Sequence, residues 1–358
     1  MSWSRSVVLI VPGRLDTCSG GYEYDRRILA GLRDRGWSVE VRELDGSFPR
    51  PTPMALDQAA RVLAEIPAGM TVLMDGLALG ALPAQVEREA ARLQVVALVH
   101  HPLAAETGLS PQEAATLERS EKRALAAVRS VVVTSRATAR SLAPYDVTPD
   151  RAAVVEPGTD RAPLASGSRE GCVHLLSVAA IIPRKGHDVL LRALAAVPER
   201  NWRLTCLGSL ERDPATVERL RARMSIGGLR GRVTLAGEGD RATVDACYDS
   251  ADIFVMPTLY EGYGMAVAEA LARGLPVVGT STGAIPELLA GIPGCDAGLL
   301  VPPGDVGRLA AALSLVVGDA ETRERLARGA RQVRDHLPTW AEASEKMARV
   351  LGGAAGRS

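Results

Sequence analysis

The chain has 358 residues, 47% of them hydrophobic and 23% charged, which is typical of a soluble globular protein long enough for two domains. Its 42 basic and 42 acidic residues balance, which excludes an overall field that would draw the protein to nucleic acid or to an anionic membrane. The five cysteines lie far apart without a CxxC pair, so neither a zinc site nor a disulfide framework is indicated. We therefore expect a reducing, cytoplasmic location.

In the first half of the chain, short β-branched runs alternate with longer amphipathic ones, the pattern of βα units around a parallel sheet. The run VVLIV at residues 7–11 is too short for a signal peptide and indicates a first strand. Further strands are predicted at residues 37–44, 71–75, 95–100, 130–135 and 152–157, with helices at 24–35 and 111–128. Glutamates interleave the basic residues of the latter helix, which favours a solvated face over membrane contact.

The alternation of strands and helices stops at residues 158–170 (GTDRAPLASGSRE), which follow Pro157. This stretch is rich in Pro, Gly and Ser, so it is the best linker candidate. The alternation then restarts, with strands predicted at 172–179, 203–209, 233–237, 252–258, 276–280 and 298–303 and helices at 188–197, 214–224 and 339–351. No run of eighteen apolar residues occurs, so no membrane span is predicted. Two tandem parallel α/β domains are expected.

The stretch EGYGMAVAEALARG at residues 261–274 has two glutamates separated by seven residues. Gly274 before Leu275–Pro276 stops a helix, which predicts a helix over residues 265–273 with Glu261 to Gly264 as the loop before it. The start of a helix favours an anion, and carboxylates accept hydrogen bonds from vicinal hydroxyls. The stretch suits a ligand that is part phosphate and part sugar, although a capped amphipathic helix with two solvated glutamates is the alternative.

At this point the sequence resembles a family. The run PTLYEGYGMAVAEALARGLPVVGTSTGAIPELL, followed by GLLVPPGD, is similar to the nucleotide-binding region of the retaining GT-B glycosyltransferases of family 4, whose hallmark is Glu-x7-Glu. Flanking stretches resemble the family too, in the expected order: SGGYEYDRRI, VVVTS, VVEPGTD and SVAAIIPRKGHDVLLRAL.

The resemblance implies the GT-B architecture, an α/β fold of two Rossmann-like parallel-sheet domains facing across a cleft. Residues 1–160 would form an N-terminal acceptor-side domain, and residues 161–336 a nucleotide-sugar-binding domain. Residues 337–358 would form a C-terminal helix that packs back on the first domain. The implied enzyme is a metal-independent, retaining, hexosyltransferase-type glycosyltransferase. It would move a sugar from a nucleotide diphosphate sugar, its co-substrate, to a hydroxyl or amine of a small acceptor, and would need no cofactor.

Carried onto this sequence, the resemblance assigns Glu269 to the ribose hydroxyls of the donor. It assigns the donor sugar to residues 261–264, namely Glu261, Gly262, Tyr263 and Gly264. The donor diphosphate would lie against Lys185, with its neighbour Arg184, and against Gly264 and Met265 at the helix start. A lysine there can neutralise charge that develops on the leaving group, so Lys185 and Glu261 are also candidate catalytic residues.

One position departs from the family. Members commonly have Gly-Arg shortly after the strand that precedes this lysine, and that arginine also binds diphosphate. This chain has Ala179–Ala180 instead, which puts donor affinity in doubt. Arg184 could substitute, although neighbouring side chains in a loop point in different directions.

In the first domain, Gly20 and Gly21 open the first predicted helix, where bare backbone could approach the diphosphate. His100 and His101 end a predicted strand, where ligands meet α/β sheets, and the family often has a histidine near the donor sugar. Both are candidate catalytic residues, with His100 aligning better, although a histidine satisfied by backbone is the alternative. No metal-ligand spacing is evident.

Other functions stay open. A nucleotide-sugar epimerase or hydrolase of similar fold would act without an acceptor, and a non-catalytic nucleotide-sugar binder would bind donor without turnover. A dinucleotide oxidoreductase is disfavoured, because no G-x-G-x-x-G follows the first strand. The acceptor, the sugar, the base and the oligomeric state are not encoded in any motif that we identify.

Overall fold

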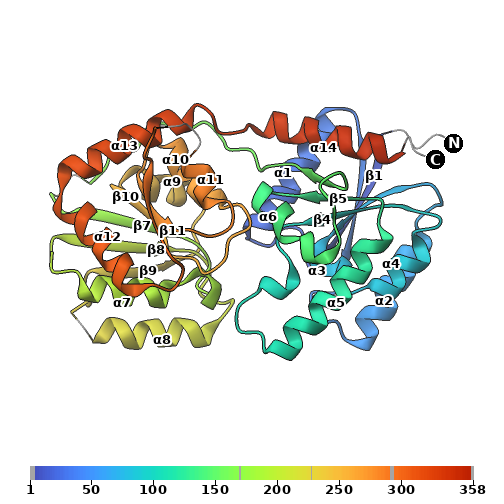
Figure 1. The fold of residues 1–358 in the computed structure, drawn as a ribbon, viewed down its shortest axis with the longest axis horizontal. Coiled ribbons are helices and arrows are strands. Elements are labelled where there is room, and N and C mark those ends of the chain that lie inside the picture. The colour runs from blue at the N-terminus through green and yellow to red at the C-terminus, as the bar shows by residue number, and fades with distance from the viewer. Residues whose placement is uncertain (1–4, 169–170, 227, 291–293, 356–358) are drawn as a thin grey trace. The chain divides into compact units, whose positions relative to one another are not determined.

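A computed structural model describes residues 5–168, 171–226, 228–290 and 294–355. The chain divides into two compact units, Met1–Gly158 with Pro338–Ser358 and Thr159–Leu337 (Figure 1). The first boundary between the units falls within the stretch predicted as a linker. Residues 169–170 of that stretch and residues 356–358 of the predicted C-terminal segment lie outside the described residues. No helix in the described part of the chain combines the length and the apolar character needed to cross a membrane.

The first unit is built on a parallel sheet of six strands in the order β2-β1-β3-β4-β5-β6. The strands are β1 (Ser6–Pro12), β2 (Ser38–Leu44), β3 (Thr71–Asp75), β4 (Gln94–Val99), β5 (Ser130–Val133) and β6 (Ala152–Val154). The helices are α1 (Gly20–Asp34), α2 (Pro53–Glu65), α3 (Gly76–Leu79), α4 (Pro83–Glu89), α5 (Pro111–Ala127), α6 (Arg136–Ser141) and α14 (Trp340–Ala355).

Successive side chains along each strand of this unit point to opposite faces of the sheet, and each face packs against a layer of helices. Val8 and Ile10 of β1 share a buried cluster with α2, α4 and α5 on one face. Helices α1 and α14 pack together, where the Arg35 guanidinium donates to the Ala341 carbonyl (2.8 Å). Helix α1 begins at Gly20, ahead of the amphipathic stretch 24–35, because the Ser19 hydroxyl caps it by accepting from the Tyr22 N–H.

The second unit is also a parallel six-stranded sheet, in the order β12-β11-β10-β7-β8-β9. Its strands are β7 (Val173–Val178), β8 (Trp202–Leu207), β9 (Val233–Gly237), β10 (Ile253–Met256), β11 (Val277–Thr280) and β12 (Gly298–Val301). Its helices are α7 (His187–Ala196), α8 (Pro214–Ser225), α9 (Arg241–Asp249), α10 (Met265–Ala272), α11 (Ile285–Leu289), α12 (Val306–Gly318) and α13 (Ala320–Arg334).

Two apolar clusters fill the two faces of this second sheet. One joins α7, α8 and α12 to the strands around the fully buried Trp202, and the other joins α9, α10 and α13 around Tyr248 and Phe254. The prediction of two tandem parallel α/β units is therefore confirmed.

Candidate functional site

The order of strands in the second sheet reverses between β7 and β10, which pair directly. In open α/β sheets, ligands bind outside the carboxyl ends of the strands at such a switch point, because the two following loops diverge there. The loop after β7 contains Lys185, and the loop after β10 contains Glu261 and leads into α10. The motif residues thus follow the two strands at which this topology favours a ligand.

Glycine allows these two loops to approach each other. Gly186 has φ +71°, and a Cβ at this position would lie 2.0 Å from the Pro257 carbonyl oxygen. The Arg184 carbonyl also accepts hydrogen bonds from the Leu259 N–H (2.7 Å) and the Thr258 hydroxyl (3.0 Å). Any larger residue at 186 would separate the loops, so the glycine holds Lys185 beside the segment that contains Glu261.

Lys185 and Glu261 form an ion pair, with Nζ 2.6 Å from Oε2, and their side chains are only 16% and 13% exposed. Arg184 turns towards the same segment, where its Nη1 donates to the Tyr260 carbonyl (3.0 Å). Both cations reach consecutive residues of one loop, although their roles towards a diphosphate stay predictions.

A glycine that the sequence analysis did not single out supports Glu261 from behind. Gly283 has φ +53°, and a Cβ built on it would lie 1.4 Å from the Glu261 carbonyl oxygen. No side chain larger than hydrogen fits there without moving the backbone of Glu261. Gly283 lies in the loop after β11, the strand beside β10, so three consecutive strand ends contribute to this site.

Helix α10 begins at Met265 as predicted, and its C-terminal residue is Ala272 rather than Arg273, which is the C-cap before Gly274 (φ +72°). Its N-cap is Gly264 (φ +98°), which has no side chain to bond the first N–H groups. The first turn of this apolar helix is therefore left without the usual side-chain cap, at the end where the helix dipole favours an anion. Gly262 and Tyr263, also assigned to the donor sugar, are both buried in the preceding loop.

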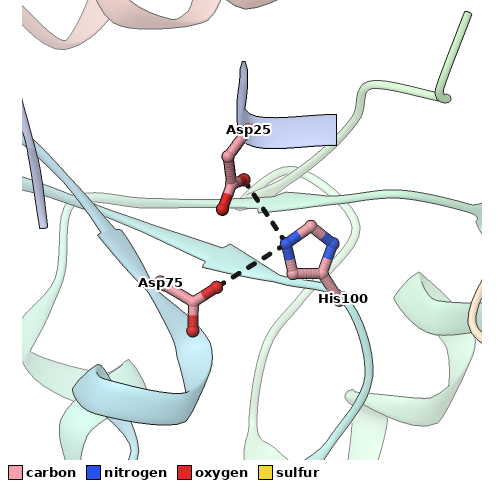
Figure 2. Close-up of side chains that lie close together, drawn as sticks. All are labelled: Asp25, Asp75 and His100. Atoms are coloured by element: carbon pink, nitrogen blue, oxygen red, sulfur yellow. Dashed lines mark ion pairs between the residues drawn. The ribbon is translucent and has the colours of Figure 1, made fainter. Parts of the chain in front are cut away.

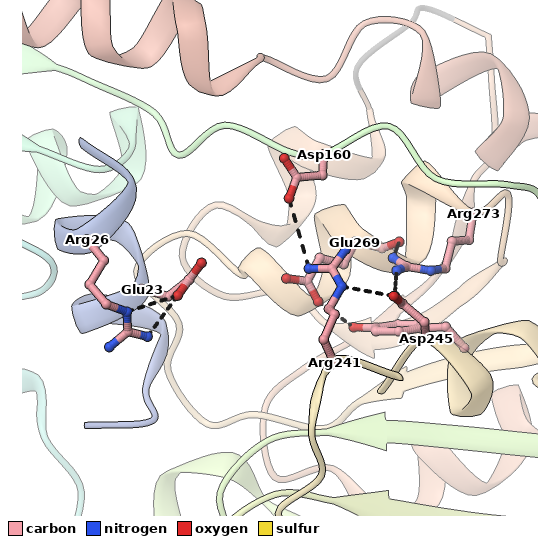
Figure 3. Close-up of polar contacts among 8 residues, drawn as sticks. Glu23, Arg26, Asp160, Arg241, Asp245, Glu269 and Arg273 are labelled. Atoms are coloured by element: carbon pink, nitrogen blue, oxygen red, sulfur yellow. Dashed lines mark hydrogen bonds and ion pairs between the residues drawn. The ribbon is translucent and has the colours of Figure 1, made fainter. Parts of the chain in front are cut away.

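Glu269 projects from the same helix, one turn beyond Met265. Its Oε2 accepts a hydrogen bond from the Tyr248 hydroxyl of α9 (3.0 Å), and burial followed by the Glu269 charge raises the pKa of Tyr248 well above its usual range. Arg273 donates to the Glu269 carbonyl and lies 4.4 Å from the Tyr248 ring centroid. Asp245 holds Arg273 and Arg241, as Figure 3 shows. The Tyr248 hydroxyl thus holds the Glu269 carboxylate, while Arg273 bonds its backbone carbonyl.

The first sheet has a switch point of its own, between β1 and β3. Asp75 ends β3 and caps α3 by accepting from the Leu77 N–H (2.7 Å). His100 follows β4, and its Nε2 lies 3.5 Å from Asp25 Oδ1 and 3.6 Å from Asp75 Oδ2 (Figure 2). Asp25 comes from the second turn of α1.

Of the other site residues predicted in the first domain, Gly20 and Gly21 lie at the start of α1, where Gly21 faces His100, and His101 lies beside Glu106. Gly21 lies in the first turn of α1 against the ring of His100, since a Cβ at 21 would lie 3.5 Å from Nε2, and Gly20 starts the same turn at the surface. His101 has a different neighbour, since its Nε2 lies 3.7 Å from a carboxylate oxygen of Glu106. His100 and His101 thus have separate surroundings despite their adjacency.

Comparison with known proteins finds a family that most of the second unit resembles. Residues 173–340, from β7 into α14, match the family described as "Glycosyl transferases group 1". This segment, slightly under half of the chain, is similar to the group 1 glycosyl transferases. It contains Arg184, Lys185, Glu261 and Glu269 together with the switch point between β7 and β10.

Proteins similar to this chain include named glycosyltransferases. The chain is 29% identical over 340 residues to the MMP alpha-(1->4)-mannosyltransferase of Mycolicibacterium hassiacum, covering 89% of this chain and 80% of the relative. It is 31% identical over 228 residues to the D-inositol 3-phosphate glycosyltransferase of Corynebacterium diphtheriae, covering 59% of this chain. That match spans only 52% of the relative, about half its length.

Solved structures share the fold of both units. Sucrose-phosphate synthase from Thermosynechococcus elongatus superposes with a TM-score of 0.80 at 22% identity, covering 97% of this chain and 98% of the other. The Anabaena protein HepE, solved with UDP and glucose, gives a TM-score of 0.74 at 18% identity, covering 96% and 98%. The two Rossmann-like units of this chain therefore have the GT-B architecture.

The sequence did not predict several residues that contact Glu269 and His100. Arg273 follows Glu269 at helical i+4 spacing, so a helix prediction could have placed them together. Tyr248 and Asp245 lie on another helix, and no spacing in the sequence links them to Glu269. Asp25 and Asp75 were missed for the same reason, since they come from different elements than His100.

Proposed function

We propose that the protein is a retaining, metal-independent glycosyltransferase that moves a sugar from a nucleotide diphosphate sugar to a hydroxyl or amine of a small acceptor. The observation that carries this proposal is the largely buried Lys185–Glu261 pair, which lies beside the glycine-capped start of α10 at the carboxyl ends of switch-point strands. The similarity to characterised glycosyltransferases supports the same reaction class.

The chemistry of the second-unit site matches the three parts of such a donor. The diphosphate would lie at the first turn of α10, where backbone N–H groups and the helix dipole favour negative charge, with Lys185 and Arg184 supplying cations. Glu261 would accept hydrogen bonds from sugar hydroxyls, and Glu269 from the ribose. HepE, a fold neighbour, has been solved with UDP-glucose, which supports a nucleotide sugar as donor.

The proposed mechanism needs no nucleophilic side chain. The acceptor would attack on the face that the leaving group departs, and the leaving phosphate would take the acceptor's proton, so configuration at the anomeric carbon is retained. Rate would then come from positioning and from stabilising the charge of the leaving diphosphate. Lys185 has three N–H donors, so it can keep its bond to Glu261 and donate to a phosphate oxygen at once.

Isothermal calorimetry against UDP, GDP, ADP and TDP, and then their sugars, tests the donor site. We expect one nucleotide to bind the wild type and to lose affinity in Lys185→Ala and Glu269→Ala. Lys122→Ala and Glu324→Ala remove surface residues that form ion pairs elsewhere, and should bind normally. Failure of the folded wild type to bind any of these nucleotides would refute the donor site.

Turnover of the bound donor separates the rival functions. A transferase consumes donor only with an acceptor, and NMR of the product should show the donor's anomeric configuration. Release of free sugar without an acceptor would indicate a hydrolase, and a changed donor sugar an epimerase. Tight binding without consumption across an acceptor screen of polyols, sugar phosphates and amines would indicate a non-catalytic binder.

A further inference from the structure

Two buried carboxylates surround one ring nitrogen in the first unit. Asp25 is 2% exposed, and neither of its carboxylate oxygens has a hydrogen-bond partner. Asp75 is 3% exposed and gives one oxygen to the Leu77 N–H, while the other faces His100. His100 Nε2 is buried between Asp25 and Asp75 (Figure 2). Such groups are costly to bury unless charge compensates them.

The positions of these atoms decide where the histidine carries a proton. An unprotonated Nε2 would direct its lone pair at two carboxylate oxygens, 3.5 and 3.6 Å away, and be repelled by both. A proton on Nε2 turns both contacts into attractions. Nε2 of His100 must therefore carry hydrogen, and Nδ1 is the ring nitrogen that lies away from the two aspartates (Figure 2).

Among the described residues, no other cation is found in contact with the His100 ring. Tyr24 meets the ring edge-on, with centroids 5.4 Å apart, and Gly21 packs against it. On the same helix as Asp25, Arg26 pairs with Glu23 (2.8 Å; Figure 3), and Arg27 stacks on the Trp340 ring at 5.0 Å. In the described part of the first unit, the imidazole is the group placed to balance the two carboxylates.

We infer that Asp25 and Asp75 are positioning residues that hold His100 as an imidazolium, with Nε2–H directed at the two carboxylates and Nδ1–H available to donate to a ligand oxygen. The His100 side chain is 20% exposed although Nε2 is buried, so the exposed surface lies elsewhere on the side chain. The site would be a fixed cationic donor at the carboxyl end of β4. A phosphate or sugar oxygen would suit this donor. The identity of that ligand rests on the proposed function, but the positive charge of the His100 ring does not.

The balance of influences on His100 agrees with this arrangement. Burial opposes a charge on His100, but Asp25 and then Asp75 outweigh it and raise the pKa of the imidazole. Burial raises the pKa of Asp75 to about 7, although the charge of His100 opposes this rise. His100 therefore keeps its proton to higher pH than an ordinary histidine, as expected for an imidazole between acids.

A divalent cation is the competing occupant, since one donor atom from each of the three side chains lies within 4.8 Å of the others. It would need Nε2 without hydrogen, because a metal binds the lone pair. The two arrangements thus differ at a single atom, and a direct measurement of the protonation of Nε2 separates them.

Nitrogen-15 NMR of the full-length protein with labelled histidine is that measurement. The chain has five histidines, and the His100→Gln variant identifies the signal of interest. We expect both ring nitrogens protonated at pH 7, with Asp25→Asn and Asp75→Asn each lowering the midpoint of titration by about one pH unit or more. Asp75→Asn keeps an oxygen that can accept from Leu77. Glu106→Gln is the matched control beside His101, and should leave the His100 midpoint unchanged.

Three results would overturn the inference: a neutral His100 ring at pH 7, a midpoint that neither asparagine variant moves, or one equivalent of chelatable metal with Nε2 bearing no hydrogen. Activity adds a separate readout. If the glycosyltransferase proposal holds, kcat/KM of Asp25→Asn should decline with rising pH earlier than that of the wild type. Failure of the proposed reaction removes only this readout, because NMR reports the ring directly.

Discussion

The substitution Gly283→Ala should displace the donor site without removing any of its side chains. The added Cβ would lie 1.4 Å from the Glu261 carbonyl oxygen, against 3.4 Å or more in ordinary van der Waals contact, so one backbone must move by about 2 Å. Glu261 would move with it, and the 2.6 Å ion pair to Lys185 would open. A misplacement of about 1 Å can lower catalysis about 100-fold, so we expect at least that loss in kcat/KM.

The left-handed conformation itself adds about 1–2 kcal/mol when alanine replaces glycine, which must be separated from the clash. Gly231→Ala is the matched control, because Gly231 has φ +76° and no atom within 4 Å of its added Cβ. Thermal denaturation and calorimetry with the donor nucleotide should show both variants destabilised but only Gly283→Ala impaired in binding. Normal donor affinity and kcat/KM in a folded Gly283→Ala protein would refute the claim that this glycine fixes the position of Glu261.

The second-unit site was largely predictable because its signals are local in sequence. A glycine N-cap, an apolar helix and a Gly-Leu-Pro stop placed the start of α10 at Met265, and the alternation of elements gave two parallel sheets. A resemblance to known enzymes then related Lys185 to Glu261, which the structure joins in an ion pair.

What the sequence could not supply is the pairing of residues from separate elements. Gly283 looks like any loop glycine until the chain passes 1.4 Å from where its Cβ would be. Asp25 occupies an amphipathic helix, where an acid would be expected to face water, yet α1 turns it inward to His100. Strand order determines both facts, and strand order follows from packing across the whole sheet rather than from any short stretch.

Two buried titratable groups should give the protein opposite pH responses, measurable as free energies of unfolding by denaturant titration. Burial raises the pKa of Glu121 to about 8, so the folded state retains a proton that the unfolded chain loses. The free energy of unfolding should therefore fall by up to about 1.4 kcal/mol per pH unit between pH 5 and 8. Glu121→Gln should remove that slope. Burial, and then the charge of Lys185, lower the pKa of His187 to about 4, so the free energy of unfolding should fall as the pH drops from 6.5 towards 4. His187→Leu should remove that decline. An unchanged slope in the Glu121 or the His187 variant would contradict the assignment of that slope to the residue. Breaking the Lys185–Glu261 pair should be more harmful than removing it. Lys185→Met or Glu261→Gln alone leaves one nearly buried group without its 2.6 Å partner, which costs about 3–5 kcal/mol in a fully buried pair and somewhat less at this exposure. The double variant leaves no unpaired charge, so it should be more stable than the less stable single variant while still failing to bind donor. Additive losses in the double-mutant cycle would show that the pair contributes no coupling, and that Lys185 and Glu261 are held in place by the loop backbone alone.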